Sequence, residues 1–196
     1  MEYATDMGCG ESMTLGKSAN GDECVRKTRA ELDELETCGV VIVGNAFSSV
    51  LFVKGEPGVA ERTGGELLSG KDGTALRAAL QALGYAPEDW AAVATWNNRG
   101  ELLDGSLLRQ AVVALDPATL VVCDDSAAEV VRNAFADDLV VLADFMDASL
   151  EPGRVVQVCG MRVLNLGGFE AALGSDHEKQ VRWAWLKQIR PLAEPY

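Results

Sequence analysis

The chain is poor in the residues that most often bind metals or form disulfides. Its 196 residues include one histidine, His177, and five scattered cysteines, none of which forms a C-x-x-C pair. Without a second histidine at ligand spacing, a tetrahedral zinc site is not expected, and cysteines in this arrangement predict reduced thiols rather than a disulfide framework. We therefore expect no bound metal. Cys123 and Cys159 lie within apolar runs and are expected in the core.

Long apolar runs and a basic leader are also missing. An apolar run such as Leu139 to Ala143 falls far short of the roughly 18 residues that a membrane span needs. No basic segment followed by an apolar stretch opens the chain, which is typical of a cytoplasmic protein without a secretory signal. The content of 48% hydrophobic and 24% charged residues is that of a globular protein. We expect a flexible arm at residues 1–22 and a single domain at residues 23–196.

Basic residues are few relative to acidic ones. There are 17 lysines and arginines against 30 acidic residues, which gives a formal charge of −13. The net charge is −5 for residues 1–40, −1 for 41–100, −9 for 101–153 and +2 for 154–196. Sequence-independent nucleic-acid binding requires a basic face, so strong binding of this kind is not expected. If DNA binds, the second and fourth stretches should carry it, and the candidate phosphate contacts are Arg62, Lys71, Arg99 and Arg162.

Short β-rich runs alternate with amphipathic helical segments along most of the chain. Strands are expected at 40–43, 50–53, 91–95, 120–123, 139–142, 154–158 and 161–164. Helices are expected at 24–37, 73–83, 107–115 and 126–135, and a last one should start at the capping box Ser175 to Glu178 and run to about Arg190. This alternation predicts β-α-β units and hence a three-layer α/β/α sandwich with a short, mainly parallel central sheet.

A loop that follows the second strand is the first candidate for a functional site. Its sequence, Lys54-Gly55-Glu56-Pro57-Gly58, places a carboxylate between glycines that allow close approach of a ligand. Active sites of open parallel sheets lie beyond the carboxyl ends of the strands, where such a loop would be. A turn with a solvated glutamate is the alternative interpretation of the same residues.

Several motifs occur in one order between residues 38 and 190. They are Val40 to Gly44, Val50 to Val53, Gly55-Glu56-Pro57-Gly58, Glu61, the run Gly65 to Gly73 leading into a helix with Leu76 and Leu80, Val93 to Asn97, Leu120 to Val131, and Lys179, Trp183, Leu186 and Ile189. This ordered set resembles the uracil-DNA glycosylase superfamily and is closest to its iron–sulfur-containing branch. The resemblance implies an α/β/α glycosylase-like domain.

The resemblance also implies roles for individual residues. Glu56 would position water for attack on the sugar, and Asn97, or Asn98 if the register differs by one, would read a base edge. The pocket around the base or another ligand would be formed by Gly55, Pro57, Gly58, Glu61, Leu68, Gly70, Asn97, Asn98 and Gly168.

The chain departs from the family pattern at the positions that carry its chemistry. No cysteine lies between Cys38 and Cys123, and an iron–sulfur cluster needs four thiolates, so we expect neither a cluster nor another cofactor. Leu68 replaces the aromatic residue that stacks on uracil. The family has a late H-P motif whose histidine supports the departing uracil anion. The corresponding position in this chain is near Gly167-Gly168-Phe169, which contains no histidine. His177 lies further along, in the cap of the last helix. The family's strand ends in a G-E-A-P-G type motif. Its first glycine corresponds to Lys54 in this chain and its glutamate to Gly55, so Glu56 is displaced by one position.

Three hypotheses for function remain, and whether the chain is an enzyme stays open. The acidic charge, Leu68 and the missing H-P motif favour a catalytically silent domain that binds a nucleobase, a nucleotide or a protein partner. The alternative is a divergent DNA glycosylase that excises a damaged or deaminated base, with Glu56 and Asn97 central. In the third, only the fold is shared and the function is unrelated.

Overall fold

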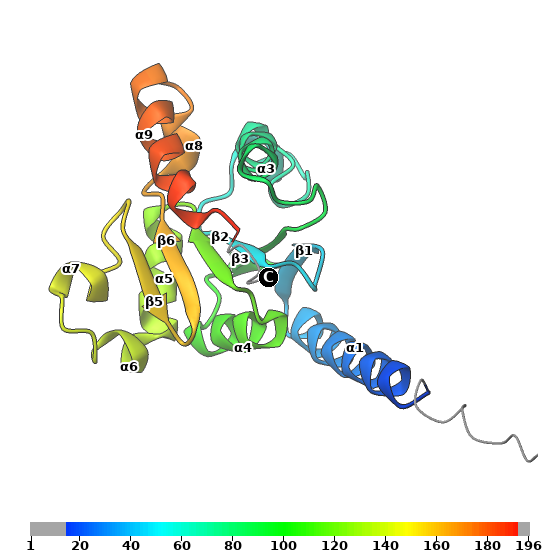
Figure 1. Cartoon of the computed structure of the whole chain (residues 1–196). Coiled ribbons are helices and arrows are strands. Elements are labelled where there is room, and N and C mark those ends of the chain that lie inside the picture. The colour runs from blue at the N-terminus through cyan, green and yellow to red at the C-terminus, as the bar shows by residue number, and fades with distance from the viewer. Residues whose placement is uncertain (1–14, 192–196) are drawn as a thin grey trace, which may run out of the picture.

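Six strands form one sheet, and helices cover both of its faces (Figure 1). The computed structural model describes residues 15–191, without the side chains of residues 15–22 and Cys24. The predicted three-layer α/β/α architecture with a mainly parallel sheet is confirmed. Of the predicted N-terminal arm, residues 1–14 lie outside the described residues, and a helix already begins at Leu15.

The helices and strands follow one another in this order: α1 (Leu15–Thr37), β1 (Val40–Gly44), β2 (Val50–Lys54), α2 (Val59–Arg62), α3 (Lys71–Leu83), β3 (Ala91–Asn97), α4 (Gly105–Leu115), β4 (Thr119–Val122), α5 (Asp125–Ala134), α6 (Ala136–Leu139), α7 (Phe145–Ala148), β5 (Val155–Val158), β6 (Met161–Asn165), α8 (Phe169–Ala172), α9 (Asp176–Leu186) and the 3₁₀ turn η1 (Lys187–Ile189).

The four central strands are parallel, and each edge strand is antiparallel to its neighbour. The order across the sheet is β1-β3-β2-β4-β6-β5. Within it, Val53 of β2 lies opposite Val93 of β3 on one side and Val122 of β4 on the other. The carboxyl ends of β3, β2, β4 and β6 therefore meet at one edge of the sheet, which we call the carboxyl edge.

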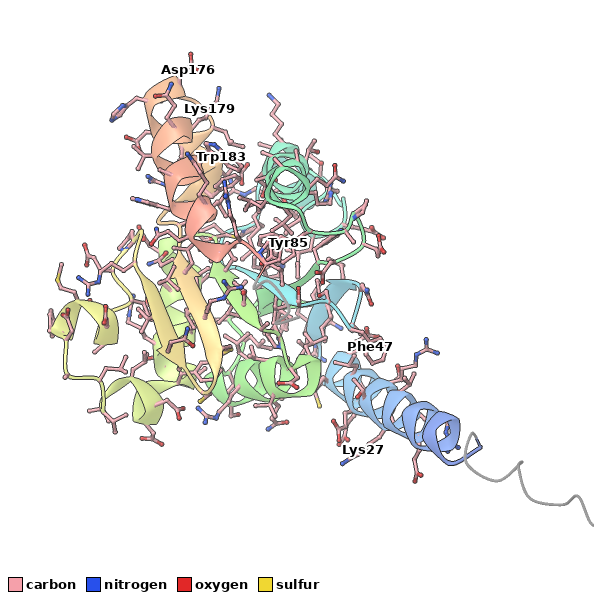
Figure 2. The ribbon with its side chains drawn as sticks, in the orientation of Figure 1. Lys27, Phe47, Tyr85, Asp176, Lys179 and Trp183 are labelled. Carbon is pink, nitrogen blue, oxygen red and sulfur yellow. The ribbon has the colours of Figure 1, made fainter. Side chains whose placement is uncertain are left out.

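Alternation along the strands divides the core into two layers. Successive side chains of a strand point to opposite faces of a sheet. Val50 and Phe52 of β2 accordingly pack with side chains of α3, α8 and α9, whereas Leu51 and Val53 pack with α1, α4 and α5. Trp183 of α9 lies in the layer that contains α3, α8 and α9, and its side chain is on the side of α9 that faces α3 (Figure 2). Both faces are thus closed, which explains why these strands are apolar without interruption.

The helix ends follow the chemistry of their capping residues. Gly84 adopts the left-handed conformation after α3, with φ 101°, as expected of a C-cap glycine. The Ser175 side chain accepts a hydrogen bond from the Glu178 backbone N–H, which confirms Ser175 as the N-cap of α9. The reciprocal half of the predicted capping box does not form, because the Ser175 backbone N–H donates to the Ala172 carbonyl and the Glu178 carboxylate pairs with Arg182. The last helix is shorter than predicted, because α9 ends at Leu186 and continues as the 3₁₀ turn η1.

Two expectations from the apolar runs are wrong. The predicted strand at residues 139–142 is the end of α6 and a turn, in which Leu139 is buried but Val140 and Val141 are each 77% exposed. Two adjacent exposed valines do not fit a strand of the core, where a run this apolar would be covered on both faces. Cys159 is exposed at the turn between β5 and β6, with φ 49°, while Cys123 is buried as predicted.

No helix in residues 15–191 is both long enough and apolar enough to cross a membrane.

Candidate functional site

The carboxyl edge contains a point where the chain leaves two neighbouring strands in opposite directions. After β2 the chain enters α3 on one face, and after β4 it enters α5 on the other. Because β2 and β4 are adjacent and parallel, a crevice opens between their carboxyl ends. Ligand sites of open α/β sheets are found at such switch points. The loops after β2, β4 and β6 therefore define the candidate site.

A buried lysine ends β2 at the bottom of this crevice. The Lys54 side chain is only 2% exposed, and its Nζ lies 2.8 Å from Glu61 Oε1, 2.5 Å from Asp72 Oδ2 and 3.4 Å from Glu170 Oε2. The position follows from alternation, since Val50, Phe52 and Lys54 all point to the α3 side of the sheet. These three carboxylates come from α2, the start of α3 and α8, so one ammonium joins three segments.

The ion pairs determine the charge states of their members. Burial alone would lower the pKa of Lys54, but hydrogen bonds and charges from Asp72 and Glu61 outweigh it and raise that pKa above the ordinary lysine value. Burial would likewise raise the pKa of Glu61, yet the hydrogen bond from Lys54 and those from backbone N–H groups lower it. Glu61 also accepts the Leu68 backbone N–H at 2.9 Å. The ammonium and the Glu61 carboxylate are therefore both charged at neutral pH.

Asp124 fixes the loop that carries Glu56. The Asp124 carboxylate accepts hydrogen bonds from the backbone N–H groups of Gly55, Glu56 and Ala127, at 2.9, 3.1 and 2.8 Å. It is at the same time the N-cap of α5. A Cβ atom on Gly55 would lie 2.1 Å from the Ala127 nitrogen, so only glycine allows this close approach of loop and helix. The loop is thus locked to the strand-to-helix turn after β4.

The pocket that remains between these loops is small. Its volume is about 60 Å³, enough for a few water molecules. It is lined by Lys54, Glu56, Asp72, Leu76, Cys123, Asp124, Gly168, Phe169, Glu170 and Ala171. Burial raises the pKa of the Cys123 thiol well above its usual value, so this cysteine is a neutral thiol and not a nucleophile.

Part of the expected site converges on this pocket. Glu56 and Gly168 line it, and Gly55 and Pro57 belong to the loop that Asp124 holds. Gly58 is buried against α8, where a Cβ atom would lie 2.5 Å from Glu170 Oε2. Glu61 binds Lys54 directly.

Leu68 and Gly70 support the site without lining it. Leu68 is 1% exposed, packs in the core layer of α3 and has a left-handed backbone with φ 57°. Its carbonyl accepts a hydrogen bond from Arg77. Gly70 is the N-cap of α3 and has an extended backbone. The position that carries the stacking aromatic in the resembled family is therefore part of the hydrophobic core.

Asn97 is the last residue of β3 and Asn98 begins the turn that follows, and neither residue lines the pocket. Asn97 accepts hydrogen bonds from the backbone N–H groups of Arg99 and Glu101 and donates its amide to the Glu101 carboxylate at 3.0 Å. Asn98 is exposed, and its backbone N–H donates to the Gly39 carbonyl. The Asn97 side chain is thus occupied in closing its own turn.

The four candidate phosphate contacts do not share one surface. Arg62 ends α2, Lys71 begins α3 and Arg99 follows β3, all at exposed positions of the carboxyl edge. Arg162 instead lies near the start of β6, opposite Thr119 at the start of β4, and so at the other edge of the sheet. Its guanidinium donates to Thr119 Oγ1 at 2.8 Å.

Sequence reasoning expected Glu61 at the site but assigned no role to the other two partners of Lys54, Asp72 and Glu170. It also assigned none to Asp124, although this residue directly follows a predicted strand and precedes a helix, which is a typical N-cap position. Within residues 15–191, no group of three or more histidines, cysteines and acidic residues is placed to hold a metal ion. The carboxylates of the site are instead arranged around the Lys54 ammonium.

Comparison of the chain with protein-family models and with curated proteins found no match.

Proposed function

We propose that this chain is a uracil-DNA-glycosylase-like domain that does not excise bases and instead acts by binding a partner protein. The observation that carries the proposal is the Lys54 side chain, buried among three carboxylates at the switch point of the sheet. Lys54 stands where the family motif has its first glycine. A side chain therefore fills space that the motif would leave free for a ligand.

The size of the remaining pocket supports a silent site. Pockets for small molecules usually measure about 300–1,000 Å³, whereas this one measures about 60 Å³. Lys54 and Asp72 form one wall of it, and separating them to enlarge the pocket would leave charges buried without partners. A pocket of this size does not hold a flipped base.

The chemistry of excision also lacks support from the residues present. Base excision needs an extruded base held by stacking, and donors that stabilise the departing anion. Leu68 is buried in the core and has no aromatic ring. Gly168, near the position of the family's late histidine, has no side chain to donate. These features favour a binding role over a catalytic one.

A matched pair of oligonucleotides tests whether the site recognises a base. Two single-stranded DNAs that differ only by uracil or thymine at one position are titrated with the full chain, and binding is followed by fluorescence anisotropy. We expect equal affinities within about twofold, because no pocket distinguishes the base. Preference for the uracil strand by about tenfold, equivalent to 1.4 kcal/mol, together with competition by free uracil, would contradict the proposal.

The second candidate function is that of a divergent DNA glycosylase, and one observation favours it. Glu56 is exposed, lines a pocket large enough for water, and has its backbone fixed by Asp124. A carboxylate held in this way can orient a water molecule. This candidate requires that a base reach Glu56 without displacing Lys54 from its three carboxylate partners.

A further inference from the structure

A second cavity lies at the edge of the sheet opposite the candidate site. The amino ends of β2, β3, β4 and β6 meet there, because these strands are parallel. Four of the residues that line it carry polar side-chain groups: Ser49, Tyr85, Asp89 and Arg162. Its volume is about 330 Å³, which is within the range of small-molecule pockets. We call it the amino-edge cavity.

The Arg162 guanidinium lines this cavity without a counter-charge. It donates hydrogen bonds to Thr119 Oγ1 at 2.8 Å and to the Arg190 carbonyl at 3.0 Å, and its Nε is buried without a hydrogen-bond partner. Within residues 15–191, no carboxylate lies within 4.0 Å of the guanidinium. Only neutral acceptors therefore hold this charge, and an anionic group would be a stronger partner for it.

Asp89 places a carboxylate in the same cavity. Its Oδ1 accepts a hydrogen bond from the Ser49 backbone N–H at 2.5 Å, and its Oδ2 accepts one from the Ser49 hydroxyl at 2.7 Å. These neutral donors fix the carboxylate, and each oxygen keeps a lone pair for a further donor. Among the described residues, no lysine or arginine forms an ion pair with it. The cavity thus contains two opposite charges that are not paired with each other.

The other groups that line the cavity are neutral. Burial raises the pKa of the Tyr85 phenol above its ordinary value, against a smaller lowering by Arg162, so the hydroxyl is protonated at neutral pH. This hydroxyl donates a hydrogen bond to the Ile189 carbonyl. The remaining lining residues are small or apolar: Gly84, Ala86, Ala118 and Pro191. They leave room for an aliphatic group.

The two charges select the kind of ligand. A simple anion would be attracted by Arg162 and repelled by Asp89, and a simple cation would meet the reverse. A molecule that carries both charges satisfies both residues. Charge-assisted hydrogen bonds are about twice as strong as neutral ones, so a small zwitterion gains two strong contacts where a singly charged molecule gains one.

We propose that the amino-edge cavity binds a free amino acid with an aliphatic side chain. The carboxylate of this ligand would accept hydrogen bonds from Arg162, its ammonium would donate to Asp89, and its side chain would lie against the small residues of the lining. The cavity shares no lining residue with the pocket beside Lys54. The inference therefore goes beyond the proposed function and does not depend on it.

The test titrates the full chain with L-leucine and with two derivatives that each lack one charge. N-acetyl-leucine has no ammonium, and leucinamide has no carboxylate. Calorimetry measures the affinities, and NMR follows the backbone amides and the Arg162 Nε. We expect leucine to bind saturably and to shift the resonances of Ser49, Asp89 and Arg162. Each derivative should bind at least about tenfold more weakly, because one charge-assisted contact is lost.

The variant Asp89→Asn tests the contact from the side of the protein. It keeps an oxygen acceptor for Ser49 but removes the charge, so it should bind leucine and N-acetyl-leucine equally while still discriminating against leucinamide. Asp89 is changed rather than Arg162, because Arg162 also holds Thr119 and Arg190 in place. The control Glu88→Gln changes a neighbouring exposed carboxylate that does not line the cavity and should keep the wild-type order of affinities.

Three results would overturn the proposal. The first is that the wild-type chain binds N-acetyl-leucine as tightly as leucine, as a simple anion site would. The second is the absence of saturable shifts at these residues up to about 10 mM leucine. The third is a shift of the Arg162 Nε resonance in ligand-free Glu194→Gln, because the guanidinium would then already be paired within the chain. The first two results need no variant, so they decide the question even if Asp89→Asn does not fold.

Discussion

A lysine side chain is rarely buried, because removing its charge from water is costly unless carboxylates compensate. Lys54 has three of them, from segments that are separate in the sequence. At the scale of single residues, the ion pairs around Lys54 therefore join three segments of the carboxyl edge, and only a small pocket remains beside them. Two predictions follow from this arrangement.

Replacing Lys54 by methionine should destabilise the fold strongly. The variant keeps an unbranched apolar stem, one atom shorter than lysine, but leaves Asp72 and Glu61 buried without their cation, a loss that typically costs about 3–5 kcal/mol. Chemical denaturation measures the change in the free energy of unfolding. Lys71→Met is the matched control, because Lys71 is exposed at the start of α3 and should change stability by less than about 0.5 kcal/mol. Equal stability of the two variants would refute the role given to Lys54.

The dependence of stability on pH should show the same ion pairs. The pKa of Glu61 is lowered in the fold, so its contribution is complete above the ordinary value of 4.5 and is lost as pH falls through the folded pKa. The pKa of Lys54 is raised, so its contribution is complete below 10.5 and is lost as pH rises through the folded pKa.

Unfolding experiments from pH 2 to 7 on Glu61→Gln test the acid limb. This variant should be less stable at neutral pH and should lose less stability on acidification than the wild type. Glu66→Gln changes an exposed carboxylate in the loop that follows α2 and should leave the acid limb unchanged. Parallel acid limbs for Glu61→Gln and the wild type would contradict the assignment.

At the scale of helices and strands, most of the fold could be predicted because the elements follow local rules. The central strands of this sheet are buried on both faces along most of their length and are apolar runs in the sequence, and helix ends carry Gly84 or Ser175 as caps. The run at residues 139–142 obeys the same pattern and is not a strand. Its Leu139 is buried and its valines are exposed, a distribution that depends on the tertiary position of α6.

Two valine-to-alanine variants distinguish these environments. Val121 of β4 is fully buried, and its truncation should cost about 2 kcal/mol through lost burial and an unfilled cavity. Val141→Ala should change the free energy of unfolding by less than about 0.5 kcal/mol, because the side chain already contacts water. A large loss for Val141→Ala would mean that residues 139–142 are packed after all.

The candidate site was only partly predictable, for a reason that also lies at this scale. The loop Gly55 to Gly58 follows a strand, so its place at the carboxyl edge could be inferred from sequence. The partners of Lys54 range from Glu61 to Glu170, and only the folded sheet brings them together. Asn97 was expected to read a base, but the local turn uses its side chain, and no pattern in the sequence distinguishes the two roles.

For the whole molecule, charge and shape separate two surfaces. The carboxyl edge is held by the ion pairs of Lys54 and leaves a pocket of about 60 Å³, while the turn after α6 exposes Val140 and Val141. The central proposal is that this pocket does not support base excision.

Single-turnover excision of uracil from single-stranded DNA, with the chain in excess and Glu56→Gln as the control, tests that claim most directly. Loss of base stacking, worth roughly 1–3 kcal/mol, and of one anion donor, worth roughly 10²–10³-fold in rate, leave excision about 10³–10⁵-fold below a competent enzyme. We predict that the wild-type chain releases uracil at least about 10³-fold more slowly than a competent glycosylase under the same conditions, and that Glu56→Gln does not change this rate. Efficient release by the wild type that disappears in Glu56→Gln would contradict the account and identify Glu56 as the catalytic carboxylate.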